Sequence, residues 1–203
     1  MIEYGLVELT RNSTSPMSAN EAKSHLRIIG NDGDPEYIQT LIDTAEAMVE
    51  EWTMIVLRRK QYVVTYPSFM TTQRNMQTIY LPRNPVVSVD SFTMLDINND
   101  PQIVTNSQLR TSLWPARLQP LAGQFWPLSK YRTMESIRVE FTAGFQAGSK
   151  DPRYMKSKLA MRYLLSHMYE NREFVIADSG AVPYALPYSL KELINSLRYG
   201  GFL

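Results

Sequence analysis

The chain has 203 residues, of which 44% are hydrophobic, and its formal net charge is +1 at pH 7. This length and composition suit one domain with its own core and exclude a disordered chain. The chain has no cysteine, which excludes disulfides and thiolate metal sites, and its near-neutral charge disfavours nucleic-acid binding as the main task.

The first part of the chain predicts an arm followed by two helices. Residues 1–16 are expected to form the arm, because a short apolar start is followed by the polar sequence RNSTSP. A helix is predicted to begin at Met17, since Ser18 and Glu21 form a Ser-x-x-Glu capping box. We expect residues 17–60 to make up the helical part.

The second helix of this part has the clearest pattern in the sequence. Asp34 is a good N-cap, and Pro35 fits the first helical position. Apolar side chains then recur at helical spacing, at Ile38, Leu41, Ile42, Ala45, Val49 and Trp52. The acidic residues of the helix lie mainly off this face, so they predict an acidic surface.

Residues 61–145 predict a β region inserted between helices. The stretches QYVVTYP, QTIYLP, VVSVDSFTML and ESIRVEFTAGF are rich in β-branched and aromatic residues and are bounded by Pro, Asn and Gly. They indicate four to six strands, mostly antiparallel, with a hairpin turn at LDINNDPQ.

A long helix is predicted over residues 151–175, because Asp151 and Pro152 repeat the cap pattern of the second helix. Its middle, LAMRYLLSHMY, is apolar almost all round, so either the rest of the chain or a neighbouring subunit must cover it. Residues 176–203 are expected to form a C-terminal segment with a short helix.

The predicted fold class is therefore α+β. A small helical bundle, made of the N-terminal helices and the long C-terminal helix, carries the inserted and mostly antiparallel β region. Residues 1–203 are expected to form a single domain.

The two histidines are the candidates for chemistry. His25 and Glu21 share one helix face, and so do His167 and Glu170. A zinc site needs three or four ligands, so either pair would require carboxylates from elsewhere in the chain. A metal-dependent hydrolase using His25, His167 and carboxylates stays open as the alternative function. The simpler interpretation is that both histidines lie at helix surfaces, and we expect no metal and no cofactor.

Charge is unevenly distributed along the sequence. Residues 1–60 carry six Lys/Arg against ten Asp/Glu, whereas residues 61–150 carry eight against five. This division favours head-to-tail contact between copies, in which an acidic patch meets a basic one. Ordinary scatter of surface charge explains it equally well. No apolar run is long enough to span a membrane, so we expect no membrane association.

Several short motifs, taken in order, resemble phage head–tail connector (head-completion adaptor) proteins, including related adaptors of gene-transfer particles. The opening Pro16–Ile28 is followed by an acidic break and an Ile-x-x-Leu-Ile helix at Ile38 to Ile42. Further matches are Leu-Pro-Arg-x-Pro-Val-x-Ser-Val at Leu81–Val89, Trp126-Pro127, Phe141–Gly144, Tyr169–Glu173, and the C-terminal Leu190, Leu193 and Arg198.

The resemblance implies a structural virion protein without catalytic activity. Its copies would form a homo-oligomeric ring (a dodecamer) below the portal protein at the capsid vertex, after assembly in the host cytoplasm. The ring would extend the channel through which genomic DNA passes without sequence-specific binding. It would also contact the next neck or tail-completion protein.

Two groups of residues are candidates for the contacts of such a ring. Asp43, Glu46 and Glu50 are expected to face the channel or a basic neighbour, and Arg172 and Glu173 to pair within the subunit or across the ring. The candidate portal-docking segment is apolar, and its residues are Leu190, Leu193, Leu197, Tyr199, Phe202 and Leu203.

Overall fold

Along the described chain, one strand comes first, two helices and seven strands follow, and two helices come last. The computed structural model describes residues 4–11, 14–28, 34–67, 78–96, 98–105, 107–111, 115–126, 136–170 and 188–198. These residues divide into two units. The β unit lies within Met1–Ser13 and Arg58–Phe145, and the helical unit within Thr14–Leu57 and Gln146–Gly200. The predicted α+β class, with an inserted antiparallel β region, is confirmed.

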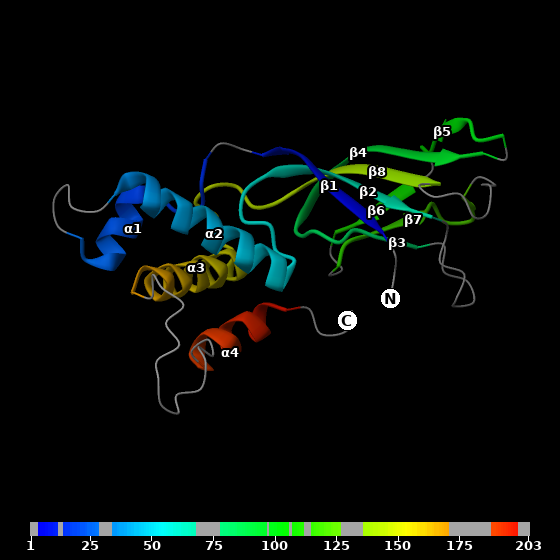
Figure 1. The fold of residues 1–203 in the computed structure, drawn as a ribbon. Helices are drawn as coiled ribbons and strands as arrows, with labels where there is room; N and C mark the ends of the chain where they lie inside the picture. Colours follow the sequence, from blue (N-terminus) through cyan, green and yellow to red (C-terminus); the bar gives the residue numbers. More distant parts are fainter. Residues whose placement is uncertain are drawn as a thin grey trace, which may run out of the picture. The chain divides into compact units, whose positions relative to one another are not determined.

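The helical unit contains four helices among its described residues. They are α1 (Ala19–Leu26), α2 (Pro35–Thr53), α3 (Pro152–Glu170) and α4 (Tyr188–Leu197). Figure 1 shows α2 and α3 side by side with α4 next to α3, and α1 contacts both α2 and α3. The core of the unit is apolar, with Ala22, Ile38, Ile42, Val49, Ala160, Met161, Leu164 and Leu165 all buried.

Local sequence signals set the helix starts, although α1 begins at Ala19, two residues after the predicted Met17. Ser18 accepts a hydrogen bond from the Glu21 backbone N–H, and the Glu21 carboxylate accepts one from the Ser18 N–H, so the capping box is confirmed. Asp34 accepts from the Glu36 N–H at 3.0 Å and caps α2. The α2 helix ends at Thr53 because Met54 adopts a left-handed conformation. The helical part therefore stops short of residue 60, where β2 begins.

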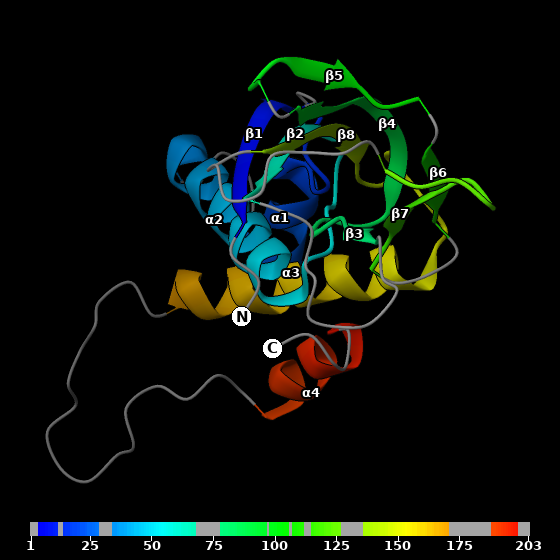
Figure 2. The ribbon, with the colours of Figure 1, turned by 90° about the vertical axis from the view of Figure 1, so that its right-hand side faces the viewer.

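The β unit contains eight strands among its described residues. They are β1 (Gly5–Arg11), β2 (Lys60–Tyr66), β3 (Ile79–Tyr80), β4 (Val86–Leu95), β5 (Pro101–Ile103), β6 (Ser107–Arg110), β7 (Arg117–Pro120) and β8 (Ile137–Ala143). The strand pairings among the described residues are antiparallel, in a five-stranded sheet of order β1-β2-β8-β4-β5 and a three-stranded sheet of order β3-β7-β6. Figure 2 shows both sheets from the side of β5 and β6.

Among the described residues, seven strands, β2 to β8, lie between Lys60 and Ala143, where four to six strands were expected over residues 61–145. The additional strands are short, with β3 only two residues long and β5 three. Strand segments this short carry too few residues for an alternating pattern to be recognised. The predicted hairpin is present, because β4 and β5 pair across the turn that follows Leu95.

Residues 1–16 differ from the predicted arm. Gly5–Arg11 form β1, which pairs with β2 at the edge of the five-stranded sheet. Leu6 lies opposite Val64, and Glu8 forms a 3.8 Å ion pair with the buried Lys60 of β2. Val7 and Leu9 of this edge strand are exposed to solvent although they are apolar. Alternation of apolar and polar residues therefore does not mark a buried face of β1 in the sequence.

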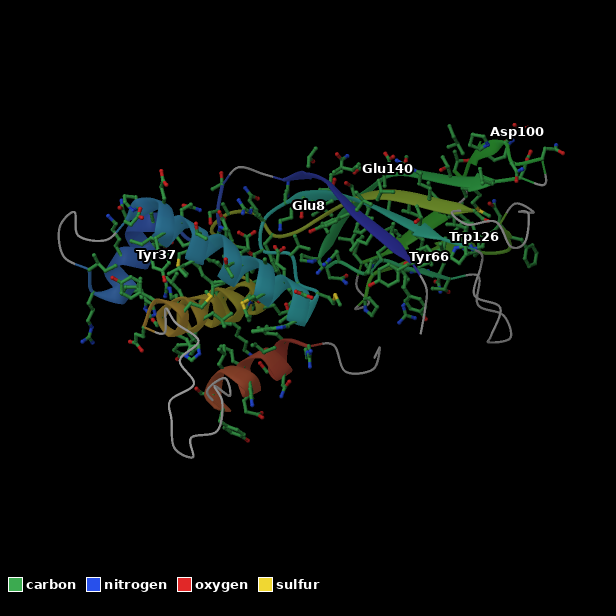
Figure 3. The ribbon with its side chains drawn as sticks, viewed as in Figure 1. Glu8, Tyr37, Tyr66, Asp100, Trp126 and Glu140 are labelled. Carbon is green, nitrogen blue, oxygen red and sulfur yellow. The ribbon has the colours of Figure 1, made fainter. Side chains whose placement is uncertain are left out.

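Aromatic side chains fill the interior of the β unit. The Phe92 and Trp126 rings meet edge to face at 5.1 Å, and the Tyr62 and Phe141 rings stack at 5.7 Å. The Tyr66 hydroxyl, labelled in Figure 3, donates to the Tyr80 carbonyl oxygen and so ties β2 to β3. Burial raises the pKa of Tyr66, which keeps this hydroxyl protonated as a donor.

Candidate functional site

The acidic surface predicted on α2 needs correction. Glu46 is 1% exposed and Glu50 is 6% exposed, so neither carboxylate lines a surface of the chain. Glu50 Oε1 instead accepts a hydrogen bond from the Leu57 backbone N–H at 2.8 Å, and it therefore holds the turn that follows α2. Asp43 is half-buried and accepts a hydrogen bond from Gln39 one helical turn earlier.

The apolar face of α4, predicted to dock on the portal, is covered by the chain itself. Leu190 and Leu197 are 1% and 5% exposed, and α4 packs on α2 and α3. Arg198 Nε also donates to the Trp52 carbonyl oxygen at 2.9 Å. Leu190 and Leu197 are therefore core residues of the helical unit, and Leu193 is half-buried beside them.

Five of the predicted contact residues lie outside the described parts of the chain. They are Arg172, Glu173, Tyr199, Phe202 and Leu203. Their roles stay predictions.

The histidines occupy helix surfaces of the helical unit. His25 Nε2 lies 3.1 Å from the carbonyl oxygen of Arg162, so this ring connects α1 to α3. His167 lies in the last turn of α3 and is half-buried. Among the residues that the structure describes, no group of three His, Asp or Glu side chains could hold a metal ion.

Glu21 connects α1 to α3 by a second contact. Its Oε1 lies 2.9 Å from Lys158 Nζ, while the same carboxylate completes the capping box of α1. Partial burial alone would raise the pKa of Glu21, but the hydrogen bonds from Lys158 and Ser18 and the charges of Lys158 and Arg162 lower it overall. The carboxylate is therefore held in its charged form, as a structural contact between the two helices.

One side of α3 carries an exposed apolar surface whose residues were not predicted from the sequence. Met155, Leu159 and Tyr163 are 59%, 38% and 43% exposed, although the opposite side of α3 is buried. They recur every four residues and so form one row along the helix. We call this row the α3 ridge. The sequence signal for the α3 ridge was the apolar middle of the helix, because such a helix must be covered on more than one side.

The exposed side of α2 differs from the α3 ridge in two ways: its side chains are smaller, and its charge is negative. Thr40, Thr44 and Ala47 are small and exposed, and at their helical spacing they form a strip that also contains the exposed Glu51. We call these four residues the α2 strip. The whole of α2 contains five Asp/Glu and no Lys or Arg, whereas α3 contains four Lys/Arg and one Glu.

An aromatic contact joins the ends of these two helices. Tyr37, labelled in Figure 3, lies in the first turn of α2, and its ring centroid is 6.3 Å from that of Tyr169 near the end of α3. The α2 and α3 helices therefore form one packed pair, with the α2 strip and the α3 ridge on their uncovered sides. No helix in the described residues is long and apolar enough to cross a membrane.

The same fold occurs in solved structures of gene-transfer particles. A chain in the virion of a native gene transfer agent particle is 22% identical and superposes with a TM-score of 0.72. A chain in the neck of an empty particle, computed with C6 symmetry, is 23% identical with a TM-score of 0.73. A chain in the neck of a native particle, computed with C12 symmetry, is 22% identical with a TM-score of 0.69.

Each likeness extends over nearly the whole of both molecules, covering 98% of this chain and 97% of the other. At these identities the likeness establishes the fold. No family model matches the chain, and no curated protein matches it.

Proposed function

We propose that this chain is a structural subunit of the neck of a tailed-phage-like or gene-transfer particle. The observation that carries the proposal is the end-to-end likeness of fold to chains in gene-transfer-agent virions and necks, with TM-scores of 0.69 to 0.73. A shared fold alone does not define a function. Here the ordered motifs from Pro16 to Arg198, which resemble those of head–tail connectors, point the same way.

In its finer form, the proposal is a ring adaptor between head and tail. Copies of the chain form a homo-oligomeric ring at the capsid vertex, bind the portal protein on one side and contact the next neck component on the other. The sixfold and twelvefold symmetry of the similar necks supports a ring of twelve copies or a related number. Genomic DNA passes through without sequence-specific binding, which agrees with a net charge of only +1.

The proposed role is structural and not catalytic. In the described part of the chain, Glu21 and Lys158 connect α1 to α3, and Glu8 and Lys60 connect β1 to β2, so these charged side chains hold the fold together. A ring subunit needs ordered outer surfaces, and each unit supplies its own, the packed helices in one and the antiparallel sheets in the other.

Electron microscopy of tagged particles tests the proposal directly. The tagged chain is expressed in cells that make particles, and the particles are purified and labelled through the tag. We expect the label at a single vertex, and rings attached to portal complexes among the broken particles. A chain that stays monomeric and never joins particles contradicts the proposal. Bound metal in that monomer would favour the hydrolase alternative.

A further inference from the structure

The α3 ridge is an apolar surface with positive charge on both sides. In a helix of 3.6 residues per turn, Lys156 falls on one side of the row formed by Met155, Leu159 and Tyr163, and Arg162 falls on the other. Lys156 is exposed and makes no hydrogen bond or ion pair within the described parts of the chain. An exposed apolar row bordered by an available cation, here Lys156, is typical of a protein-binding surface.

The α2 strip is complementary to this ridge. Its small side chains, Thr40, Thr44 and Ala47, leave room for large ones to approach the helix closely. Its charge is negative, because Glu51 is exposed in line with them and Asp43 lies beside them. Within the described residues, Glu51 has no hydrogen-bond or ion-pair partner, so its carboxylate is available to a cation on another molecule.

We propose that the α3 ridge of one copy packs on the α2 strip of the next copy. Met155, Leu159 and Tyr163 would insert between the small residues of α2, and Lys156 would face Glu51. Opposite charges on the two surfaces would determine which faces meet. They would disfavour contacts between the α2 helices of two copies, or between their α3 helices, because like charges would then meet.

A second copy is the occupant because one chain carries both complementary surfaces at once. Since α2 and α3 pack together through their buried sides, each copy keeps its own strip and its own ridge available. The contact is therefore head-to-tail: it repeats from copy to copy and closes into a ring when the rotation allows. This inference rests on the proposed neck function for its ring, and it names the helices that join neighbouring subunits.

Cross-linking through introduced cysteines tests the contact, because the natural chain has none. Ala47→Cys lies at the middle of the α2 strip and Leu159→Cys at the middle of the α3 ridge, so their proximity does not depend on the direction in which the helices cross. The two full-length single variants are mixed and treated with a short thiol-reactive cross-linker. We expect a heterodimer in the mixture and little homodimer from either variant alone.

The control mixture pairs Ala47→Cys with Asn195→Cys on the exposed side of α4. The experiment is made on the purified chain and on particles assembled with both variants. No more heterodimer than in the control, in both samples, overturns the inference. Abundant homodimer from either single variant also overturns it, because that result shows a symmetric contact.

Charge reversal provides an independent measurement in the same cysteine backgrounds. Lys156→Glu and Glu51→Lys should each lower the cross-linking yield by about tenfold or more, since like charges would then meet across the contact. A chain carrying both reversals should recover most of the yield. Lys191→Glu on α4 is the matched control and should leave the yield unchanged. Failure of the double variant to recover contradicts the pairing of these two faces.

The outcomes separate this inference from the proposed function. Particles labelled at one vertex without α2–α3 cross-links would leave the neck function standing and reject this interface. Cross-links in the purified chain, together with a chain that never joins particles, would support the interface and reject the neck function.

Discussion

The backbone N–H of Gly144 donates a hydrogen bond to the carbonyl oxygen of Pro85, with an N···O distance of 2.8 Å. Gly144 directly follows β8, and Pro85 directly precedes β4, the neighbouring strand in the sheet. Two motifs of the sequence, Leu81–Val89 and Phe141–Gly144, therefore meet at one corner of the β unit. Their association in the sequence has a physical cause, because this corner fixes where β4 and β8 begin to pair.

Gly144 should tolerate no side chain. Its φ is +119°, and a Cβ atom there would lie 2.6 Å from the carbonyl carbon of Arg58. Gly144→Ala should lower the free energy of unfolding by about 3 kcal/mol, from strain and backbone collision together. Urea denaturation followed by tryptophan fluorescence measures the change.

Gly123→Ala is the control for this prediction. Gly123 also has a positive φ, +79°, but a Cβ atom there would meet nothing within 4 Å. It should therefore cost only about 1 kcal/mol, the penalty of the left-handed conformation alone. Equal effects of the two substitutions would show that the collision at Arg58 is not important.

Asn84 should be essential to the same corner. Its buried side chain accepts a hydrogen bond from the Ala116 N–H at 3.0 Å and donates to the Leu81 carbonyl oxygen at 3.4 Å. Asn84→Ala leaves the Ala116 N–H without this acceptor and should cost about 1–3 kcal/mol of unfolding free energy. The exposed Asn98 provides a control, because Asn98→Ala should change the unfolding midpoint little.

The contact of Glu21 with Lys158 should make stability depend on acid pH. The folded state lowers the pKa of Glu21 below its ordinary 4.5, so the folded carboxylate binds protons less readily than the unfolded one. Its contribution is therefore present above pH 4.5 and is lost as the pH falls through the lowered pKa. Glu21→Gln should reduce this loss in thermal melts between neutral and acid pH. An unchanged pH profile would show that the contact does not contribute.

The packing of α4 on its own chain should appear in hydrogen exchange. Leu190 is buried in the helical unit, so Leu190→Ala should lower the free energy with which α4 packs on the other helices by about 2–5 kcal/mol. Amide hydrogen exchange should then rise throughout Tyr188–Leu197. Lys191→Ala changes an exposed neighbour and should leave exchange as in the natural chain. If the leucine variant exchanged no faster than the lysine variant, α4 would not be held by its apolar face.

The sequence by itself determined the features that depend on neighbouring residues. The starts of α1, α2 and α3 follow from Ser18, Asp34 and Asp151, because a cap is formed within a few positions of the residue that makes it. The inserted β region was recognisable from its β-branched and aromatic composition. The α+β class followed from these two signals together.

The tertiary structure decided everything that depends on a distant partner. The segment before residue 16 contains β1 because β2, about fifty residues further along the chain, lies beside it. The apolar face of α4 is covered by α2 and α3, while three large residues of the apolar α3 stay open. Periodicity shows that a helix has a face to bury, but only packing between elements far apart in the chain determines which faces remain for another molecule.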